Sequence, residues 1–131
     1  MVEENHVPEN AIFCCFGCMS SVGTLTGVAM LEAYKKLDKE KNGLFCISAI
    51  AAGVPKHRKT TEQAKRIIVI DGCYNKCAKK ILEANGFKVD KYLNLLLDLD
   101  IPKIGPFKTF DYSQEDLEKA VNEIVKMAAV K

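Results

Sequence analysis

The segment RIIVID, residues 66–71, is the feature that most restricts what this chain can fold into. It is a short continuous apolar run, as in a strand buried on both faces, and a helical pattern follows it at once and ends at Asn85-Gly86. Two similar runs, AIFCC at 11–15 and LFCI at 44–47, precede further turn and helix signals. Buried strands that alternate with helices predict a mostly parallel sheet with helices on both faces.

The remaining elements follow from spacing and capping patterns. Residues 21–38 carry apolar side chains at helical intervals after Ser20 and Ser21, which are good N-cap residues. The other predicted elements are a short helix after a capping box at 60–63, a fourth strand within 88–97, and a last helix that opens at Ser113 and Asp116 with an apolar stripe of Leu117, Val121, Ile124 and Ala128.

The length of 131 residues is that of one domain with one substantial core. We therefore expect residues 1–131 to form a single three-layer α/β domain, flavodoxin-like or Rossmann-like, in the predicted order βαβαβαβα. In such a sheet, right-handed crossovers allow the first strand to lie between the second and the third.

Composition excludes several classes of function. No run of about 18 apolar residues is present, so we expect no membrane partner. The acidic, polar start MVEENHVPEN lacks the features of a secretion signal, which predicts a cytoplasmic location. The net charge is only +2, and the one basic cluster, PKHRK at 55–59, is interpreted as a solvated loop that includes His57, so no nucleic-acid partner is expected.

The cysteines are the strongest candidates for functional residues. In a reducing compartment they are more often metal ligands or catalytic thiols than structural disulfides. Those that follow predicted strands should meet at the carboxyl edge of the sheet, where parallel sheets place their functional crevice. These candidate metal ligands are Cys15, Cys18, Cys46, Cys73 and Cys77.

The pair after the third strand has a more specific prediction. If the helix begins at residue 72, Cys73 and Cys77 are four residues apart on one helix face, with Asp71 as the N-cap. The helix dipole would then favour a thiolate at Cys73. Cys14 alternates with Cys15 along the first strand, so we interpret it as a buried, inert side chain.

Three segments of the chain resemble the DGC-domain family of zinc-binding proteins: CFGCMSSVGTLT, FCISAIAAG and VIDGCYNKCAKKILEANG. The similarity covers residues 11–86 and extends to about 105. It implies a cytoplasmic α/β domain whose chelating cysteines are Cys15, Cys46, Cys73 and Cys77. The chain departs from the family pattern at Tyr74, where a proline is expected, and in the additional thiol of Cys18.

The same residues also bear on other chemistries. A P-loop is excluded because Gly17 and Gly23 are not followed by lysine, and a cysteine phosphatase lacks its arginine. The alternatives are a thiol enzyme or carrier that acts through Cys15 or Cys73, for which a carrier needs only backbone amides at a helix N-terminus, and a redox pair at Cys15 and Cys18. Four thiolates also suit an iron–sulfur cluster, but the number of thiols at one sheet edge leads us to predict one zinc ion.

Overall fold

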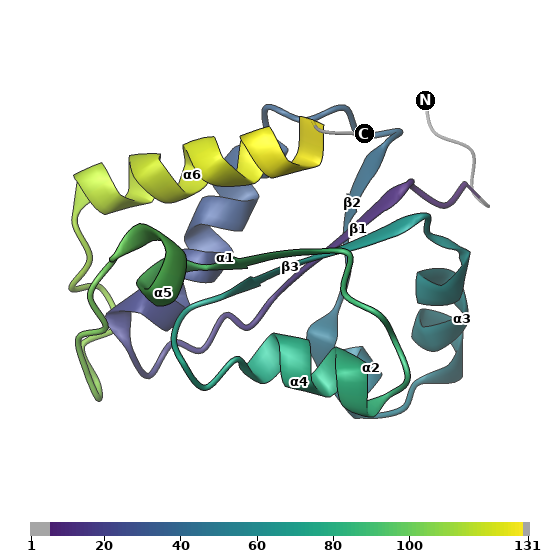
Figure 1. Ribbon diagram of the computed structural model, residues 1–131, viewed down its shortest axis with the longest axis horizontal. Helices are drawn as coiled ribbons and strands as arrows, with labels where there is room; N and C mark the ends of the chain where they lie inside the picture. The colour runs from purple at the N-terminus through teal and green to yellow at the C-terminus, as the bar shows by residue number, and fades with distance from the viewer. Residues whose placement is uncertain (1–5, 130–131) are drawn as a thin grey trace.

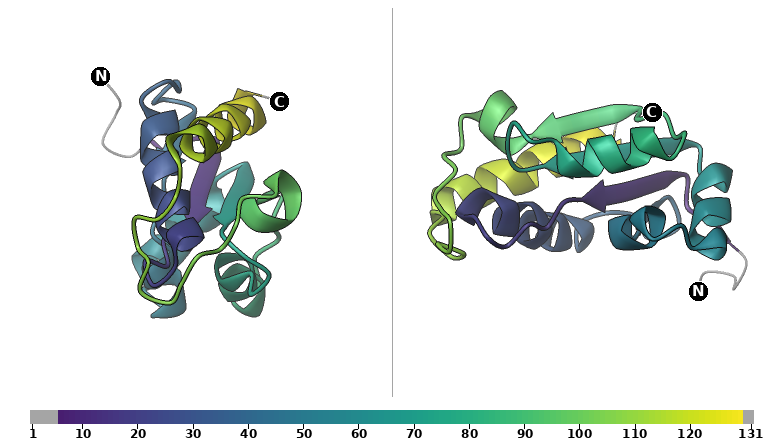
Figure 2. Two further views of the ribbon diagram at one scale, coloured as in Figure 1. Left: turned by 90° about the vertical axis from the view of Figure 1, so that its left-hand side faces the viewer. Right: turned by 90° about the horizontal axis from the view of Figure 1, so that it is seen from below.

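The computed structural model describes residues 6–129 and has a four-stranded parallel sheet between two layers of helices (Figures 1 and 2). This is the predicted three-layer α/β architecture. The first five residues of the acidic N-terminal segment, and residues 130–131, lie outside the described residues. Within the described part, no helix is long and apolar enough to cross a membrane.

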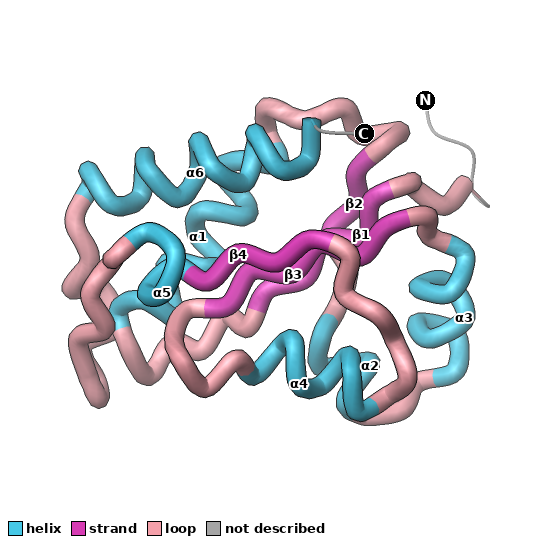
Figure 3. The backbone as a smooth tube through the Cα atoms, viewed as in Figure 1, coloured by secondary structure: helices cyan, strands magenta, loops and turns pink. Residues whose placement is uncertain are grey.

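The sheet has the strand order β2-β1-β3-β4 (Figure 3). Its strands are β1 (Asn10–Cys14), β2 (Asn42–Leu44), β3 (Arg66–Asp71) and β4 (Lys91–Asn94). All three pairings are parallel, and β1 lies between β2 and β3 as predicted. This order equals that of the first four strands of a flavodoxin-like sheet.

Helices cover both faces of the sheet. They are α1 (Ser21–Tyr34), α2 (Ile47–Ala51), α3 (Pro55–Gln63), α4 (Cys77–Ala84), α5 (Leu95–Leu99) and α6 (Gln114–Ala129). In Figure 1, α1 and α6 lie on one side of the sheet, and α2 and α4 lie on the other. β1, β3 and β4 run toward the left of that view, where β4 leads into α5, so the carboxyl edge of the sheet faces that end of the molecule.

Alternate side chains of β1 divide the core into two layers. Ile12 and Cys14 pack with α1 and α6, whereas Ala11 and Phe13 pack with α2 and α4. All four side chains are buried, which explains why the strand reads as a continuous apolar run. Cys14 is therefore in the core between the sheet and α1, as predicted.

Two helix starts agree with the capping patterns. Ser20 Oγ accepts a hydrogen bond from the amide of Gly23 at 3.2 Å, and α1 begins at the next residue. Ser113 Oγ accepts one from the amide of Asp116 at 3.0 Å, directly before α6. Both serines satisfy amides that have no partner within their helix.

The predicted start of the helix that follows the third strand is wrong. α4 begins at Cys77 rather than at residue 72, because Lys76 has a left-handed backbone with φ of 53° that interrupts the helix. Cys73 therefore lies in a loop, and it does not share a helix face with Cys77. Asp71 still accepts amide hydrogen bonds at the start of α4, but it does so from across the loop.

Three further boundaries differ from the prediction. PKHRK is the start of α3 rather than a loop, because the φ angle of Pro55 suits the first turn of a helix. Residues 60–63, predicted to cap a following helix, form the end of α3 instead. His57 is exposed on it. β2 occupies 42–44 rather than 44–47, and the leucine run within 88–97 leaves the strand after Asn94 to form α5.

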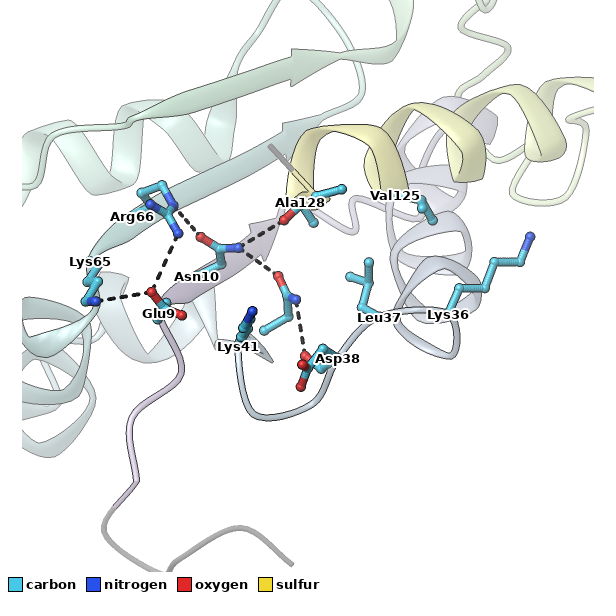
Figure 4. Close-up of a pocket in the computed structure, with 12 residues that line it drawn as sticks. Glu9, Asn10, Lys36, Leu37, Asp38, Lys41, Lys65, Arg66, Val125 and Ala128 are labelled. Atoms are coloured by element: carbon cyan, nitrogen blue, oxygen red, sulfur yellow. Dashed lines mark hydrogen bonds and ion pairs between the residues drawn. The ribbon is translucent and has the colours of Figure 1, made fainter. Parts of the chain in front are cut away.

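A buried polar network joins the strands to α6 at the amino edge of the sheet (Figure 4). Asn10 Nδ2 donates to Asn42 Oδ1 at 2.9 Å and to the carbonyl oxygen of Ala128 at 3.3 Å. Arg66 Nε donates to Asn10 Oδ1 at 2.7 Å. Both asparagines are buried, and no buried side-chain nitrogen or oxygen in the described chain lacks a hydrogen-bond partner. The network thus fixes the end of the sheet opposite the cysteines.

Candidate functional site

A pocket of about 700 Å³ lies at the carboxyl edge of the sheet and is lined by four cysteines. Cys15 and Cys18 come from the loop after β1, Cys73 comes from the connection between β3 and α4, and Cys77 is the first residue of α4. We call this the thiol pocket. The loop between α5 and α6 completes it with Lys103, Gly105 and Pro106, and this connection runs along the left end of Figure 1.

The loop that carries Cys15 and Cys18 lies directly on α1. Phe16 has a positive φ of 44°, and its amide donates to Thr26 Oγ1 at 3.0 Å. A Cβ atom at Gly23 would overlap the carbonyl oxygen of Gly17, and one at Gly27 would overlap the ring of Phe16. Because both of these helix positions are glycines, the cysteine loop can lie in direct contact with α1.

The two thiols of this loop have different surroundings. Cys15 is half-buried, with Sγ 3.6 Å from Thr26 Oγ1, and burial raises the pKa of its thiol. Cys18 is exposed, and its Sγ lies 3.5 Å from the carbonyl oxygen of Phe16. Cys18 is accordingly the more accessible thiol of the pair.

Asp71 organises the connection that carries the other two thiols. Its carboxylate accepts hydrogen bonds from the amides of Ala78 at 2.9 Å and Lys79 at 3.1 Å, and from the hydroxyl of Tyr92 at 3.1 Å. It is 1% exposed. Burial is the main cause of a raised pKa at Tyr92, so this hydroxyl stays a hydrogen-bond donor.

Asn94 extends this network to Cys73. Its Nδ2 group donates to the backbone carbonyl of Cys73 at 2.8 Å and also contacts the Tyr92 hydroxyl at 3.0 Å. Asn94 is 1% exposed, so the position of the Cys73 backbone is set by buried side chains of β3 and β4. The capping role of Asp71 is predictable from its place before Gly72, whereas no pattern in the sequence marks Tyr92 or Asn94.

Lys103 is the residue of the pocket that sequence reasoning missed. Its Nζ donates to Cys73 Sγ at 3.4 Å and lies 5.1 Å from the centroid of the Tyr74 ring. Thirty residues separate Lys103 from Cys73, and no local motif marks it. It reaches the pocket because Ser21 exchanges hydrogen bonds with the backbone of Ile104, at 2.8 and 2.9 Å.

Cys46 does not line the thiol pocket. It occupies the N-cap position of α2, and its Sγ lies 3.1 Å from Ser48 Oγ. This hydrogen bond, together with one from the amide of Ala49, lowers the pKa of the exposed Cys46 thiol. Cys14 is also outside the pocket, and burial raises the pKa of its thiol to about 12.

The structure therefore brings together four of the five predicted metal ligands around one pocket. Within residues 6–129, however, no three histidine, cysteine, aspartate or glutamate side chains are arranged so that they could hold a metal ion. The predicted zinc site stays a prediction. Donor chemistry suits the metal, since thiolates are preferred ligands of zinc, but the loops would have to bring the thiols closer.

Comparison with known proteins identifies one family. The sequence matches the DGC domain over residues 11–124. The match thus extends past the three segments at 11–86 and includes the loop with Lys103 and most of α6. No curated protein and no solved structure matches the chain.

Proposed function

The chain belongs to the DGC domain family, and from this premise we propose that it is a zinc-binding protein whose ligands are Cys15, Cys18, Cys73 and Cys77. The observation that carries the proposal is that these four thiols line one pocket at the carboxyl edge of the sheet. Four thiolates would saturate a tetrahedral zinc ion, and such a closed site is structural or sensory.

The spacing of the thiols supports this ligand set. Cys15 and Cys18 are separated by two residues, and Cys73 and Cys77 by three. Structural zinc sites are commonly assembled from two such pairs on separate loops. Cys46, which was among the sequence-based candidates, is outside the pocket and is left out of the proposed set.

Binding would couple to movement of both loops. Because the thiols are not arranged as ligands in the described chain, the loops at 15–20 and 72–76 must close for the metal to bind. Lys103 supports the proposal, since its ammonium group already contacts Cys73 and would offset part of the negative charge of four thiolates on one divalent ion.

Elemental analysis of protein purified without chelator tests the proposal. We expect about one zinc per chain and no visible absorption, because zinc is colourless whereas an iron–sulfur cluster is brown. The double variant Cys73→Ala/Cys77→Ala should lose the metal, and the matched control Cys46→Ala should keep it. A wild-type chain without metal, or a double variant that retains it, would rule the site out.

A thiol-dependent activity is the second candidate, and the contact between Lys103 and Cys73 favours it. The Nζ atom of Lys103 lies 3.4 Å from Cys73 Sγ, so a cationic group adjoins a thiol in the pocket, and reactive cysteines are typically found in such electropositive surroundings. In the redox version, the Cys15 and Cys18 thiols would pass two electrons and two protons to an acceptor disulfide and form a Cys15–Cys18 disulfide. Titration of the metal-free chain against reduced and oxidised glutathione, followed by mass spectrometry, would detect that bond.

A further inference from the structure

The contact between Lys103 and Cys73 joins two reactive groups from distant parts of the sequence. Nζ of Lys103 lies 3.4 Å from Cys73 Sγ. Within residues 6–129, Lys103 forms no ion pair with a carboxylate, and the other interaction of its ammonium group is with the ring of Tyr74, whose centroid is 5.1 Å away. The amine is therefore directed at the thiol instead of being held by an acidic side chain.

The backbone on both sides of this contact is held in place. Next to the lysine, the amide of Ile104 donates to Ser21 Oγ at 2.9 Å, and the carbonyl of Ile104 accepts from the amide of Ser21 at 2.8 Å. At the cysteine, the buried side chain of Asn94 donates to the carbonyl of Cys73 at 2.8 Å. Both reactive side chains thus extend from fixed positions, which favours reaction between them over reaction with more distant groups.

The surroundings of Cys73 suit attack by a small oxidant. The residue is half-buried and lines the thiol pocket, which is open to solvent and has a volume of about 700 Å³. A positive charge beside a partly exposed thiol is typical of cysteines that oxidants modify. In the part of the chain that the structure describes, Cys73 Sγ hydrogen-bonds to the amine of Lys103 and to no other thiol, so the amine is the nearest partner for an oxidised sulfur.

We propose that Cys73 and Lys103 form a reversible sulfur–nitrogen cross-link when the metal-free chain meets a peroxide. Hydrogen peroxide first converts the thiol to a sulfenic acid and releases one water. Nζ of Lys103 then attacks Sγ: the S–N bond forms, the S–O bond breaks, and the hydroxyl group leaves as water with a proton from the amine. The sulfur loses two electrons and the peroxide gains them. Two molecules of glutathione reverse the reaction by forming a disulfide and restoring the thiol and the amine.

The cross-link would regulate metal binding, and this consequence rests on the proposed zinc site. A chain in which Cys73 is bonded to nitrogen has three free thiols left in the pocket, so it should bind zinc more weakly until a reductant cleaves the bond. The bond also protects Cys73 from irreversible oxidation to the sulfinic acid. Its formation requires only the two side chains and a peroxide, so the cross-link is testable whether or not the chain binds zinc.

Peptide mapping of the full-length chain tests the proposal. Protein treated with a chelator and then with stoichiometric hydrogen peroxide is alkylated with iodoacetamide and digested with trypsin without reductant. Because trypsin does not cleave after a modified lysine, we expect residues 67–76 joined to residues 92–108, with a mass two hydrogens below the sum of the two peptides. Glutathione should separate them again. Oxidation in guanidinium should give at least about tenfold less of this product, because unfolding separates the two groups.

Two arginine variants are matched controls. Lys103→Arg keeps a positive charge beside Cys73 but replaces the amine by a guanidinium group that stays protonated. This variant should form no cross-link, and dimedone should instead trap the sulfenic acid at Cys73. Lys108→Arg makes the same change elsewhere on the loop and should cross-link as the wild type does. Circular dichroism verifies that each variant is folded, and zinc content measured before chelation reports separately on the metal site.

Several results would overturn the proposal. These are an unmodified Cys73, a disulfide from Cys73 to another cysteine as its main product, cross-linking to Lys76 or Lys108 in equal amount, or equal yields from the folded and the unfolded chain. The outcome is separable from that of the zinc proposal. A wild-type chain that carries no zinc but forms the bond would refute only the zinc site, and a zinc-binding chain that forms no bond after chelation would refute only the cross-link.

Discussion

Gly23 of α1 lies directly under the carbonyl group of Gly17, so that no Cβ atom can be placed at position 23 without overlapping the carbonyl oxygen. Nothing lies within 4 Å of a Cβ built at Gly17 itself. The contact is therefore asymmetric: there is no room for a side chain at Gly23 on the helix, but there is room for one at Gly17 on the loop. This asymmetry offers a matched pair of substitutions at one contact.

Gly23→Ala should displace the loop that carries Cys15 and Cys18 and lower the free energy of unfolding by about 1–3 kcal/mol, as overpacked sites do. Gly17→Ala should stay within about 0.5 kcal/mol of wild type. Urea denaturation followed by circular dichroism measures both. Equal effects of the two alanines would show that the loop does not rest on α1 as described.

Asp71→Asn should be destabilising because the carboxylate of Asp71 accepts three hydrogen bonds in a buried site. An amide offers one acceptor oxygen and places an NH₂ group near donors, so we expect a loss of about 1–3 kcal/mol. Thermal and urea unfolding measure it. The exposed Asp111→Asn is the control, and a loss as large at Asp111 would contradict the special role of Asp71.

Tyr92→Phe tests the same network from β4. It removes only the hydroxyl that donates to Asp71 and accepts from Asn94, so the expected loss in the free energy of unfolding is about 0.5–1.5 kcal/mol. In the double variant with Asp71→Asn, the two losses should not add, because both substitutions remove the same hydrogen bond between Tyr92 and Asp71. Strict additivity in urea denaturation would count against a shared network.

Cys14 should resist alkylation in the folded protein. Burial raises the pKa of its thiol to about 12, and only the thiolate reacts. At pH 8, iodoacetamide should label the exposed Cys46 in the native chain and label Cys14 only after unfolding in guanidinium. Peptide mass spectrometry identifies the labelled residue, and native labelling of Cys14 would contradict its place in the core.

The same raised pKa predicts a loss of stability in alkali. The Cys14 thiol ionises near pH 8.5 in the unfolded chain but only near pH 12 in the folded one, so the unfolded state releases its proton first. This contribution to stability is complete below about pH 8.5 and falls as the pH rises toward 12. Urea midpoints between pH 7 and 11 should fall less steeply in Cys14→Ala than in wild type.

Cys18 gives a test of the proposed zinc site that needs no substitution. Although its side chain is exposed, a zinc-bound thiolate should react slowly with iodoacetamide, and a chelator should make it react quickly. If Cys18 is labelled first while zinc remains bound, it is not a ligand. It would then be a reactive thiol beside the metal, as a redox-responsive switch requires.

The sheet could be predicted from the sequence because its central strands are buried on both faces. RIIVID reads as β3 without ambiguity, and the place of β1 between β2 and β3 follows from right-handed crossovers. Ser20 and Ser113 were identifiable as caps because each hydrogen-bonds an amide three residues ahead, a purely local interaction.

What the sequence could not show depends on long-range packing. The left-handed conformation of Lys76 has no local signature, so the helix appeared to start at residue 72 and Cys73 appeared to belong to it. The leucines after Asn94 suit a strand or a helix equally, and tertiary context decides for α5. Lys103 enters the pocket only because its loop is tied to Ser21.

The outer strands of the sheet are shorter than the inner ones, with three residues in β2 and four in β4 against five in β1 and six in β3. A short edge offers few unpaired backbone groups to a strand of another molecule, so the folded chain is a poor template for fibril growth. The segments NAIFC and RIIVID have the opposite character, being apolar and rich in strand-forming residues. The two short border strands thus cover the backbone edges of β1 and β3, and loss of either border strand would expose a long apolar strand to pairing with another chain.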